Sequence, residues 1–217
     1  MKQILVYSDS LTWGIIPNSR QRLTFDKRWP GVMENALLAE DKKVRILEDC
    51  LNGRRTAFDD PYKPGRNGLQ SIEQRMEIHA PLALLILMLG TNDFQSMHPH
   101  NAWHAKQGMA ALIKAARNSP IEPGMPIPDI LIVTPPAIQT AKANMREKFA
   151  GGDEKCIGLA NAYKAIADEM HCHFFDAGTV TDSSKVDGVH LDEDQHQALG
   201  VALAVQVSKL IESGSLD

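Results

Sequence analysis

The stretch ILVYSDSLTWG, residues 4–14, joins an apolar run to a short polar turn. The run Ile4–Tyr7 is apolar on both faces, as expected for a strand of a parallel sheet that is covered on both sides. The turn after it presents two hydroxyl groups and one carboxyl group, at Ser8, Asp9 and Ser10. We expect a first strand here, with the turn leading into a helix, which is how an α/β domain begins.

The remainder of the chain continues this alternation of strand-like and helix-like segments. Further strands are predicted at Val44–Leu47, Leu82–Leu89, Ile130–Val133 and His173–Phe175. Helices are predicted at Pro30–Ala39, Leu69–His79, Asn101–Asn118, Asp153–Glu169 and near Asp192–Ile211. This order implies right-handed crossovers and an α/β fold, a three-layer α/β/α sandwich with a central parallel sheet of about five strands. No repeat or linker is visible, so residues 1–217 are expected to form a single domain.

Composition excludes several classes of function. The formal charge is −4 and no basic cluster is longer than a pair such as Arg54-Arg55, so a nucleic-acid partner is not expected. No apolar run approaches the roughly 20 residues of a membrane helix, and the first apolar run is too short for a signal peptide. The three cysteines (Cys50, Cys156 and Cys172) match no zinc spacing and suit free thiols in a reducing compartment. We therefore expect a cytoplasmic protein without a membrane partner.

Two segments at opposite ends of the chain carry candidate catalytic groups. Ser10 lies at a strand-to-helix turn, where a hydroxyl can be presented at the sheet edge near the positive end of a helix. Asp187 precedes His190 by three residues, directly before the last predicted helix. On such a turn the carboxylate can reach the imidazole and leave its other nitrogen free to accept a serine proton. Helix capping explains each segment equally well when it is considered alone.

Two further signals follow predicted strands. Asn92 comes just after the most hydrophobic strand, where its amide could donate a hydrogen bond to a developing oxyanion. Gly53 follows the second strand, where a glycine lets a substrate approach the backbone closely, although an ordinary turn would also need it. If one sheet edge gathers these residues, then nucleophile, base, orienting carboxylate and oxyanion donors are each supplied once, as acyl transfer requires.

Three loops stand out between the regular elements. Pro17–Lys27, Asp59–Gly68 and Pro135–Gly152 are polar or rich in proline and glycine. In open α/β sheets, ligands bind outside the carboxyl ends of the strands, where such loops gather. The histidines at positions 98, 100 and 104 have no carboxylate at a suitable spacing, so we expect solvated histidines, no metal site and no cofactor.

Taken together, these motifs resemble the blocks of the SGNH (GDSL) hydrolases. Ser8-Asp9-Ser10-Leu11 is similar to block I, Gly53 to the glycine of block II, Gly90–Asp93 to block III and Asp187–His190 to block V. They occur in the family order and span nearly the whole chain. The likeness extends to a bacterial branch of arylesterases and acyltransferases, through stretches such as Phe149–Gly152, Phe174–Gly178 and Gly200–Ala204.

The resemblance implies a serine esterase acting on short-chain or aryl carboxylic esters through an acyl-enzyme, with acyl transfer or perhydrolysis as a further activity. It implies Ser10 as nucleophile, with His190 as base and Asp187 as its orienting carboxylate. The oxyanion would be held by the N–H groups of Ser10 and Gly53 and by the Asn92 side chain.

Three further expectations accompany this resemblance. Trp13 is expected to form a wall of the substrate pocket, with plain core packing as the alternative. Ser8 stands where the motif has glycine, which leaves the geometry of the turn in question. Members of the branch form compact oligomers, so a homo-oligomer is expected.

Other functions fit the same fold. A thioesterase, a lysophospholipase or a carbohydrate deacetylase would use the same triad, because specificity resides in the loops. A flavodoxin-like binding module would use the hydroxyl-rich loop Ser8–Thr12 to hold a phosphate, but it leaves Asn92, Asp187 and His190 unexplained. In an esterase, activity should fall as His190 becomes protonated, because a protonated imidazole cannot act as a base.

Overall fold

The computed structural model describes residues 1–19, 21–214 and 216. Its centre is a parallel sheet of five strands. They are β1 (Lys2–Ser8), β2 (Val44–Cys50), β3 (Leu84–Met88), β4 (Asp129–Thr134) and β5 (His173–Asp176). The predicted strands are confirmed, and four of them extend by one to three residues beyond the apolar run that predicted them. The third is shorter than predicted, because Leu82 and Ala83 lead into the strand from the preceding turn.

The strand order in the sheet is β2-β1-β3-β4-β5. Neighbouring strands are all parallel, so every connection crosses over the sheet and all five carboxyl ends lie at one edge. Strand β1 is an interior strand, and it pairs with the edge strand β2 through Ser8↔Cys50 and with the central strand β3 through Ser8↔Met88. The chain runs from β1 outward to β2 and then back across to β3, so the turn that follows β1 lies where the strand order reverses, which is where ligands bind in such sheets.

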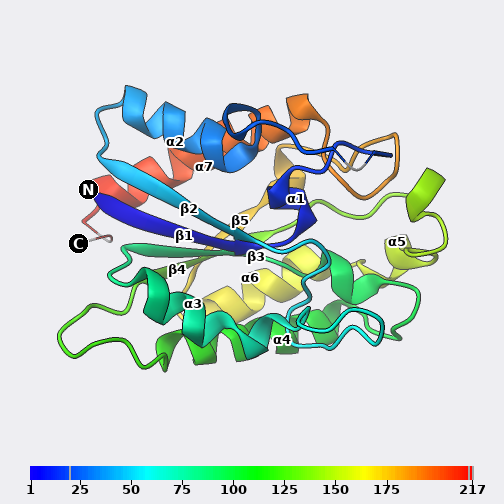
Figure 1. Ribbon diagram of the computed structural model, residues 1–217, viewed down its shortest axis with the longest axis horizontal. Helices are drawn as coiled ribbons and strands as arrows, with labels where there is room; N and C mark the ends of the chain where they lie inside the picture. Colours follow the sequence, from blue (N-terminus) through cyan, green and yellow to red (C-terminus); the bar gives the residue numbers. More distant parts are fainter. Residues whose placement is uncertain (20, 215, 217) are drawn as a thin grey trace.

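Helices cover both faces of the sheet (Figure 1). The helices α2 (Trp29–Ala39) and α7 (Glu193–Glu212) pack on one face. The helices α3 (Ile72–His79), α4 (Ala102–Arg117) and α6 (Leu159–Glu169) pack on the other. Each layer encloses its own apolar cluster, so the predicted three-layer α/β/α sandwich is confirmed. Within the part of the chain that the structure describes, no helix is long and apolar enough to cross a bilayer.

Two predicted helices are interrupted in the structure. The segment predicted as Asp153–Glu169 contains the end of a short helix, α5 (Gly152–Lys155), and then α6. The break falls at Gly158, whose φ of +84° lies in the left-handed region and ends helical geometry. The segment predicted as Leu69–His79 begins instead as a single 3₁₀ turn, η2 (Gly68–Gln70), before α3 starts at Ile72.

Candidate active site

The turn between β1 and the helix α1 (Ser10–Trp13) places Ser10 at the carboxyl edge of the sheet. The side chain of Asp9 caps the short helix by accepting a hydrogen bond from the N–H of Leu11 at 3.0 Å. Gly14 ends it with a φ of +82°, and a Cβ there would lie only 2.5 Å from the Arg28 side chain. The nucleophile candidate is thus fixed on both sides, and Ser10 keeps 6% of its surface exposed.

Ser8, which stands where the resembling motif has glycine, belongs to a buried chain of hydroxyl hydrogen bonds. Its hydroxyl donates to the Met88 carbonyl at 2.7 Å and accepts from the Thr12 hydroxyl at 2.6 Å. The Thr12 oxygen in turn accepts from the indole N–H of Trp29 at 3.1 Å. The extra hydroxyl therefore joins β3, α1 and α2, and the structure accommodates it without an unpaired polar group.

Asp187 and His190 form a closed hydrogen-bonded turn. One carboxylate oxygen of Asp187 lies 2.7 Å from Nδ1 of His190. The other oxygen accepts from the backbone N–H groups of Val189 and His190, both at 2.9 Å. This geometry holds Nδ1 as the protonated nitrogen and directs the free Nε2 away from the carboxylate.

Gly188 is required by the way this turn packs. Its φ is +78°, and a Cβ would lie 2.6 Å from the carbonyl oxygen of Thr140. The loop that contains Thr140 is bonded to the turn twice, from Gln139 N–H to the Gly188 carbonyl and from Lys142 N–H to the Asp187 carbonyl, both at 2.9 Å. The predicted loop Pro135–Gly152 thereby supports the candidate base.

One cavity of about 530 Å³ gathers most of the predicted site. Its lining includes Ser10, Trp13, Gly53, Asp187 and His190. The segment that contains Ser10 and the segment that contains Asp187 and His190 therefore lie at the same edge of the sheet, as the motifs required. No hydrogen bond joins Ser10 to His190 among the described residues; in unliganded enzymes such bonds are often long and shorten when substrate binds.

The backbone donors predicted for the oxyanion are available in this cavity. Gly53 adopts a φ of +85°, so the turn after β2 takes a conformation that favours glycine. Among the described residues, neither the N–H of Ser10 nor the N–H of Gly53 donates to another group of the chain. Both are free to bind a negative oxygen.

Asn92 lies beside the cavity rather than on its wall. It is part of the 3₁₀ turn η3 (Thr91–Phe94), directly after β3. Its amide donates to the Asp9 carboxylate at 2.8 Å and to the Arg54 carbonyl at 3.2 Å, and its oxygen accepts from Gln95 at 2.7 Å. Both amide hydrogens are thus engaged inside the protein, which the sequence did not indicate.

Three buried carboxyl groups surround this region, and their pKa values diverge. Burial raises the pKa of Asp9 to about 6, against the opposing effect of hydrogen bonds from Leu11 and Asn92. Burial likewise raises the pKa of Asp93 to about 7, although the Thr56 hydroxyl and N–H donate to it. Burial would also raise the pKa of Asp187, but hydrogen bonding and charge from His190 lower it overall. Only Asp187 is held as an anion next to an imidazole.

Gln95 is a site residue that the sequence reasoning missed. It lines the cavity, donates to the oxygen of Asn92 and accepts from Arg55 at 2.7 Å. Arg55 is fully buried and also pairs with Asp60 at 2.8 Å. The position of Gln95, three residues after Asn92, was the available signal, since i,i+3 residues of a 3₁₀ turn lie on the same side.

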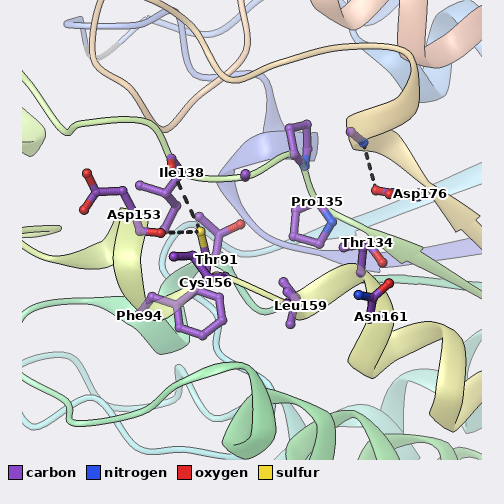
Figure 2. A pocket seen from close by; sticks show the side chains of 16 residues that line it. Thr91, Phe94, Thr134, Pro135, Ile138, Asp153, Cys156, Leu159, Asn161 and Asp176 are labelled. Carbon is purple, nitrogen blue, oxygen red and sulfur yellow. Dashed lines mark hydrogen bonds between the residues drawn. The ribbon is translucent and has the colours of Figure 1, made fainter.

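A second cavity, of about 320 Å³, lies at the ends of β4 and β5, next to the start of α6 (Figure 2). Its lining combines the buried hydroxyls of Thr91 and Thr134 with apolar groups such as Phe94 and Leu159. It also contains the thiol of Cys156, whose pKa is raised by burial, so the thiolate is disfavoured. No histidine lines this cavity, and we therefore place the chemistry in the larger one.

The histidines at 98 and 100 differ from the sequence expectation. They are half-buried rather than solvated, and their rings stack with centroids 4.9 Å apart. Burial lowers the pKa of His98, and it lowers that of His100 to about 4. No cluster of three potential ligands that could bind a metal occurs in the described ranges of the chain.

Comparison with known proteins identifies the family that the sequence motifs resemble. Residues 9–198 match the model of the GDSL-like lipase/acylhydrolase family. An aryl esterase from M. smegmatis is 37% identical, with 97% of this chain and 100% of that chain covered and a TM-score of 0.91. A carbohydrate acetylesterase from Sinorhizobium meliloti is 33% identical over the same shares of the two chains, also with a TM-score of 0.91.

A curated arylesterase from Vibrio mimicus is 28% identical over 92 residues, which are 42% of this chain and 38% of that protein. The family model covers most of the chain, and the structural likeness extends over nearly all of it. The chain therefore belongs to the GDSL-like lipase/acylhydrolase family.

Proposed function

We propose that this protein is a serine esterase that hydrolyses short-chain or aryl carboxylic esters through an acyl-enzyme on Ser10. The observation that carries the proposal is the single cavity lined by Ser10, His190 and Asp187, with an imidazole hydrogen-bonded to a buried carboxylate. Family membership and the esterase relatives support carboxylic-ester hydrolysis as the reaction.

The first half of the reaction forms the acyl-enzyme. Nε2 of His190 accepts the proton of the Ser10 hydroxyl as Oγ attacks the carbonyl carbon of the ester. The tetrahedral intermediate then collapses, the bond to the leaving oxygen breaks, and His190 gives its proton to the departing alcohol. In the second half, a water molecule loses a proton to His190 and attacks the acyl carbon, which frees the acid and restores Ser10.

Asp187 acts on the base rather than on the substrate. Its carboxylate holds the Nδ1 proton of His190 and stabilises the imidazolium that forms in each half-reaction. The two backbone N–H bonds to its other oxygen keep the carboxylate ionised and fix its orientation.

The oxyanion is held by the N–H groups of Ser10 and Gly53, which have no other acceptor among the described residues. Asn92 is the proposed third donor. Of its two bonds, the one to the Arg54 carbonyl is the longer, at 3.2 Å, and we propose that this N–H turns toward the oxyanion. The bond to Asp9 would then keep the amide in position.

The walls of the cavity limit the substrate. Trp13 lines it, and the guanidinium of Arg22 lies 4.7 Å from the centre of its ring. The remaining lining combines apolar side chains such as Ile15 and Met97 with the amide side chains of Asn18, Asn52 and Asn144, which can bind hydroxyl groups. A carbohydrate acetyl ester is therefore a second candidate substrate class, which the relative from Sinorhizobium meliloti favours.

The test uses 4-nitrophenyl acetate and a phosphonate inhibitor. Ser10→Ala should lower kcat/KM by about 10⁴-fold or more, because the nucleophile is removed. The phosphonate should add one equivalent of mass to the wild type, on Ser10, and none to the variant. Ser119→Ala, at the end of α4 and outside the cavity, is the matched control. Undiminished activity of the Ser10 variant, with its fold intact by circular dichroism, would disprove the mechanism.

A further inference from the structure

Three cationic side chains line the cavity that contains Ser10. Lys63 and Arg66 come from the loop predicted at Asp59–Gly68, and Lys148 comes from the loop predicted at Pro135–Gly152. Two separate loops thus each bring positive charge to the same cavity. The sequence showed that these loops would gather at the sheet edge, but it did not show that their charges converge.

The positive charge in this cavity is offset only in part, and not by ion pairs to these three side chains among the described residues. Within the described ranges, none of the three cations has a carboxylate within 4.0 Å. The two lining carboxylates already have partners, because Asp60 pairs with Arg55 at 2.8 Å and Asp187 binds His190 at 2.7 Å. The chain as a whole carries a formal charge of −4, so this local excess is opposite in sign to the rest of the protein.

Lys148 has a pKa that is affected by these positive charges. It is half-buried, and its ammonium lies 5.5 Å from the centre of the Phe149 ring. Burial is the main cause that lowers its pKa, and the positive charges of Lys63 and Arg55 lower it further, while the carboxylates of Asp60 and Asp9 have the opposite, smaller effect. Cations that crowd one another without a carboxylate partner destabilise the empty site, and a bound anion removes that cost.

We propose that the preferred substrate is an ester that itself carries an anionic group, such as a carboxylate or a phosphate, which Lys63, Arg66 and Lys148 bind while the ester carbonyl lies at Ser10. This proposal rests on the proposed esterase function and specifies its substrate class. Neutral aryl or sugar acetates gain no charge–charge attraction from the three cations, whereas an anionic ester gains it on approach and in the bound state.

The experiment compares matched esters that differ in charge. One pair places the charge on the leaving group, 4-acetoxybenzoate against its methyl ester. The other places it on the acyl group, mono-(4-nitrophenyl) succinate against 4-nitrophenyl butyrate. Each kcat/KM is divided by the rate constant of the same ester with hydroxide, so that intrinsic reactivity largely cancels. In at least one pair the anionic ester should be preferred by about tenfold at low salt, and 0.5 M NaCl should reduce that preference.

Variants then locate the effect. Lys148→Met and Lys63→Met should each lower the anionic-to-neutral ratio about threefold, and the double variant should lower it further. Arg66 is left unchanged because its Nε also holds the Asn52 carbonyl at 3.0 Å, next to the Gly53 turn. Lys114→Met removes the same charge from α4 outside the cavity and is the matched control.

The two proposals fail in different ways. If neither the neutral nor the anionic esters are hydrolysed, the esterase function is wrong. If neutral esters are hydrolysed through Ser10 but neither anionic ester is preferred, the esterase function stands and the anionic substrate class is overturned. A preference that the Lys148 and Lys63 variants retain would also overturn it, because the charge would then be recognised elsewhere.

Discussion

Asp187 and Asp93 are both buried carboxyl groups near the carboxyl edge of the same sheet, yet their environments differ. Asp187 contacts an imidazole and two backbone N–H groups, and its pKa is lowered overall. The carboxyl group of Asp93 accepts hydrogen bonds from the N–H and hydroxyl of Thr56, yet burial raises its pKa to about 7. Burial penalises both anions, so the difference lies in the partner that each group has.

This difference indicates a catalytic role for Asp187 and a structural role for Asp93. A carboxylate that remains charged beside a histidine can stabilise a transient imidazolium. A carboxyl group that keeps its proton up to neutral pH has a structural role instead. Here Asp93 links η3 to the segment after β2 through its hydrogen bonds with Thr56. Substituting each carboxyl group by an amide should therefore affect activity at Asp187 and mainly stability at Asp93.

The largest effect is expected from Asp187→Asn. The amide can no longer hold the Nδ1 proton of His190 in the required tautomer, so kcat/KM should fall by about 10³–10⁴-fold on 4-nitrophenyl acetate. The parallel change Asp93→Asn should cost far less activity, because Asp93 does not line the cavity. Equal losses for the two variants, measured at a pH where both are folded, would break the distinction.

Asn92→Ala should have the next largest effect. Losing one oxyanion donor typically lowers kcat by about 10²–10³-fold. In this protein the change also removes the bond to Asp9, so stability should be measured with activity. An unchanged affinity for the ground-state ester, with kcat alone reduced, would identify Asn92 as a donor to the transition state. A loss below about threefold would show that its two internal bonds persist during catalysis.

The pH dependence of stability should distinguish Asp93 from Asp187 by sign. The pKa of Asp93 is raised to about 7 in the folded protein, from 3.8 for a free aspartate side chain, so the folded state binds its proton more tightly. The wild type should therefore lose stability as pH rises from about 4 to about 7, by on the order of 1–3 kcal/mol relative to Asp93→Asn. Urea unfolding of both proteins across this range measures the difference.

For Asp187 the linkage runs the other way. Its pKa in the folded protein lies below the 3.8 of a free aspartate side chain, so its contribution to stability is present above pH 3.8 and is lost only as pH falls below that value. The wild type should thus keep a constant advantage over Asp187→Asn between pH 5 and 8. An advantage that already declines as pH falls from 8 toward 5 would mean that the pKa of this carboxyl group is not lowered in the folded protein.

The fold could be predicted from the sequence because its signals are local. Apolar runs such as Ile130–Val133 identify buried strands, and their alternation with helices leaves few topologies. The broken helix at Asp153–Glu169 could not be predicted with equal certainty. A single glycine inside a helical pattern is often tolerated, so Gly158 alone does not predict a break. Its left-handed conformation, which separates α5 from α6, is visible only in the structure.

The motifs of the site could be predicted from the sequence, but the hydrogen-bond partners of its side chains could not. The spacing of Asp187 and His190 indicated one turn, and that turn closes with a bond of 2.7 Å. The hydrogen bonds of Asn92 to Asp9 and Arg54 join residues up to 83 positions apart, and no local sequence pattern predicts them. The cations at Lys63 and Lys148 converge for the same reason, since only the folded loops bring them to one cavity.

The smallest effect is expected in a third buried network, which contains no charge. Ser8→Ala removes the hydroxyl between Thr12 and Met88, so a buried donor and a buried acceptor both lose a partner, and stability should fall by about 1–3 kcal/mol. Adding Thr12→Val removes the stranded donor but also takes the acceptor from the indole N–H of Trp29. The double variant should therefore cost less than the sum of the single variants, without returning to the wild type, as measured by urea unfolding at one pH. Strict additivity would show that the two hydroxyls do not depend on each other, and that the serine is merely tolerated where a glycine would serve.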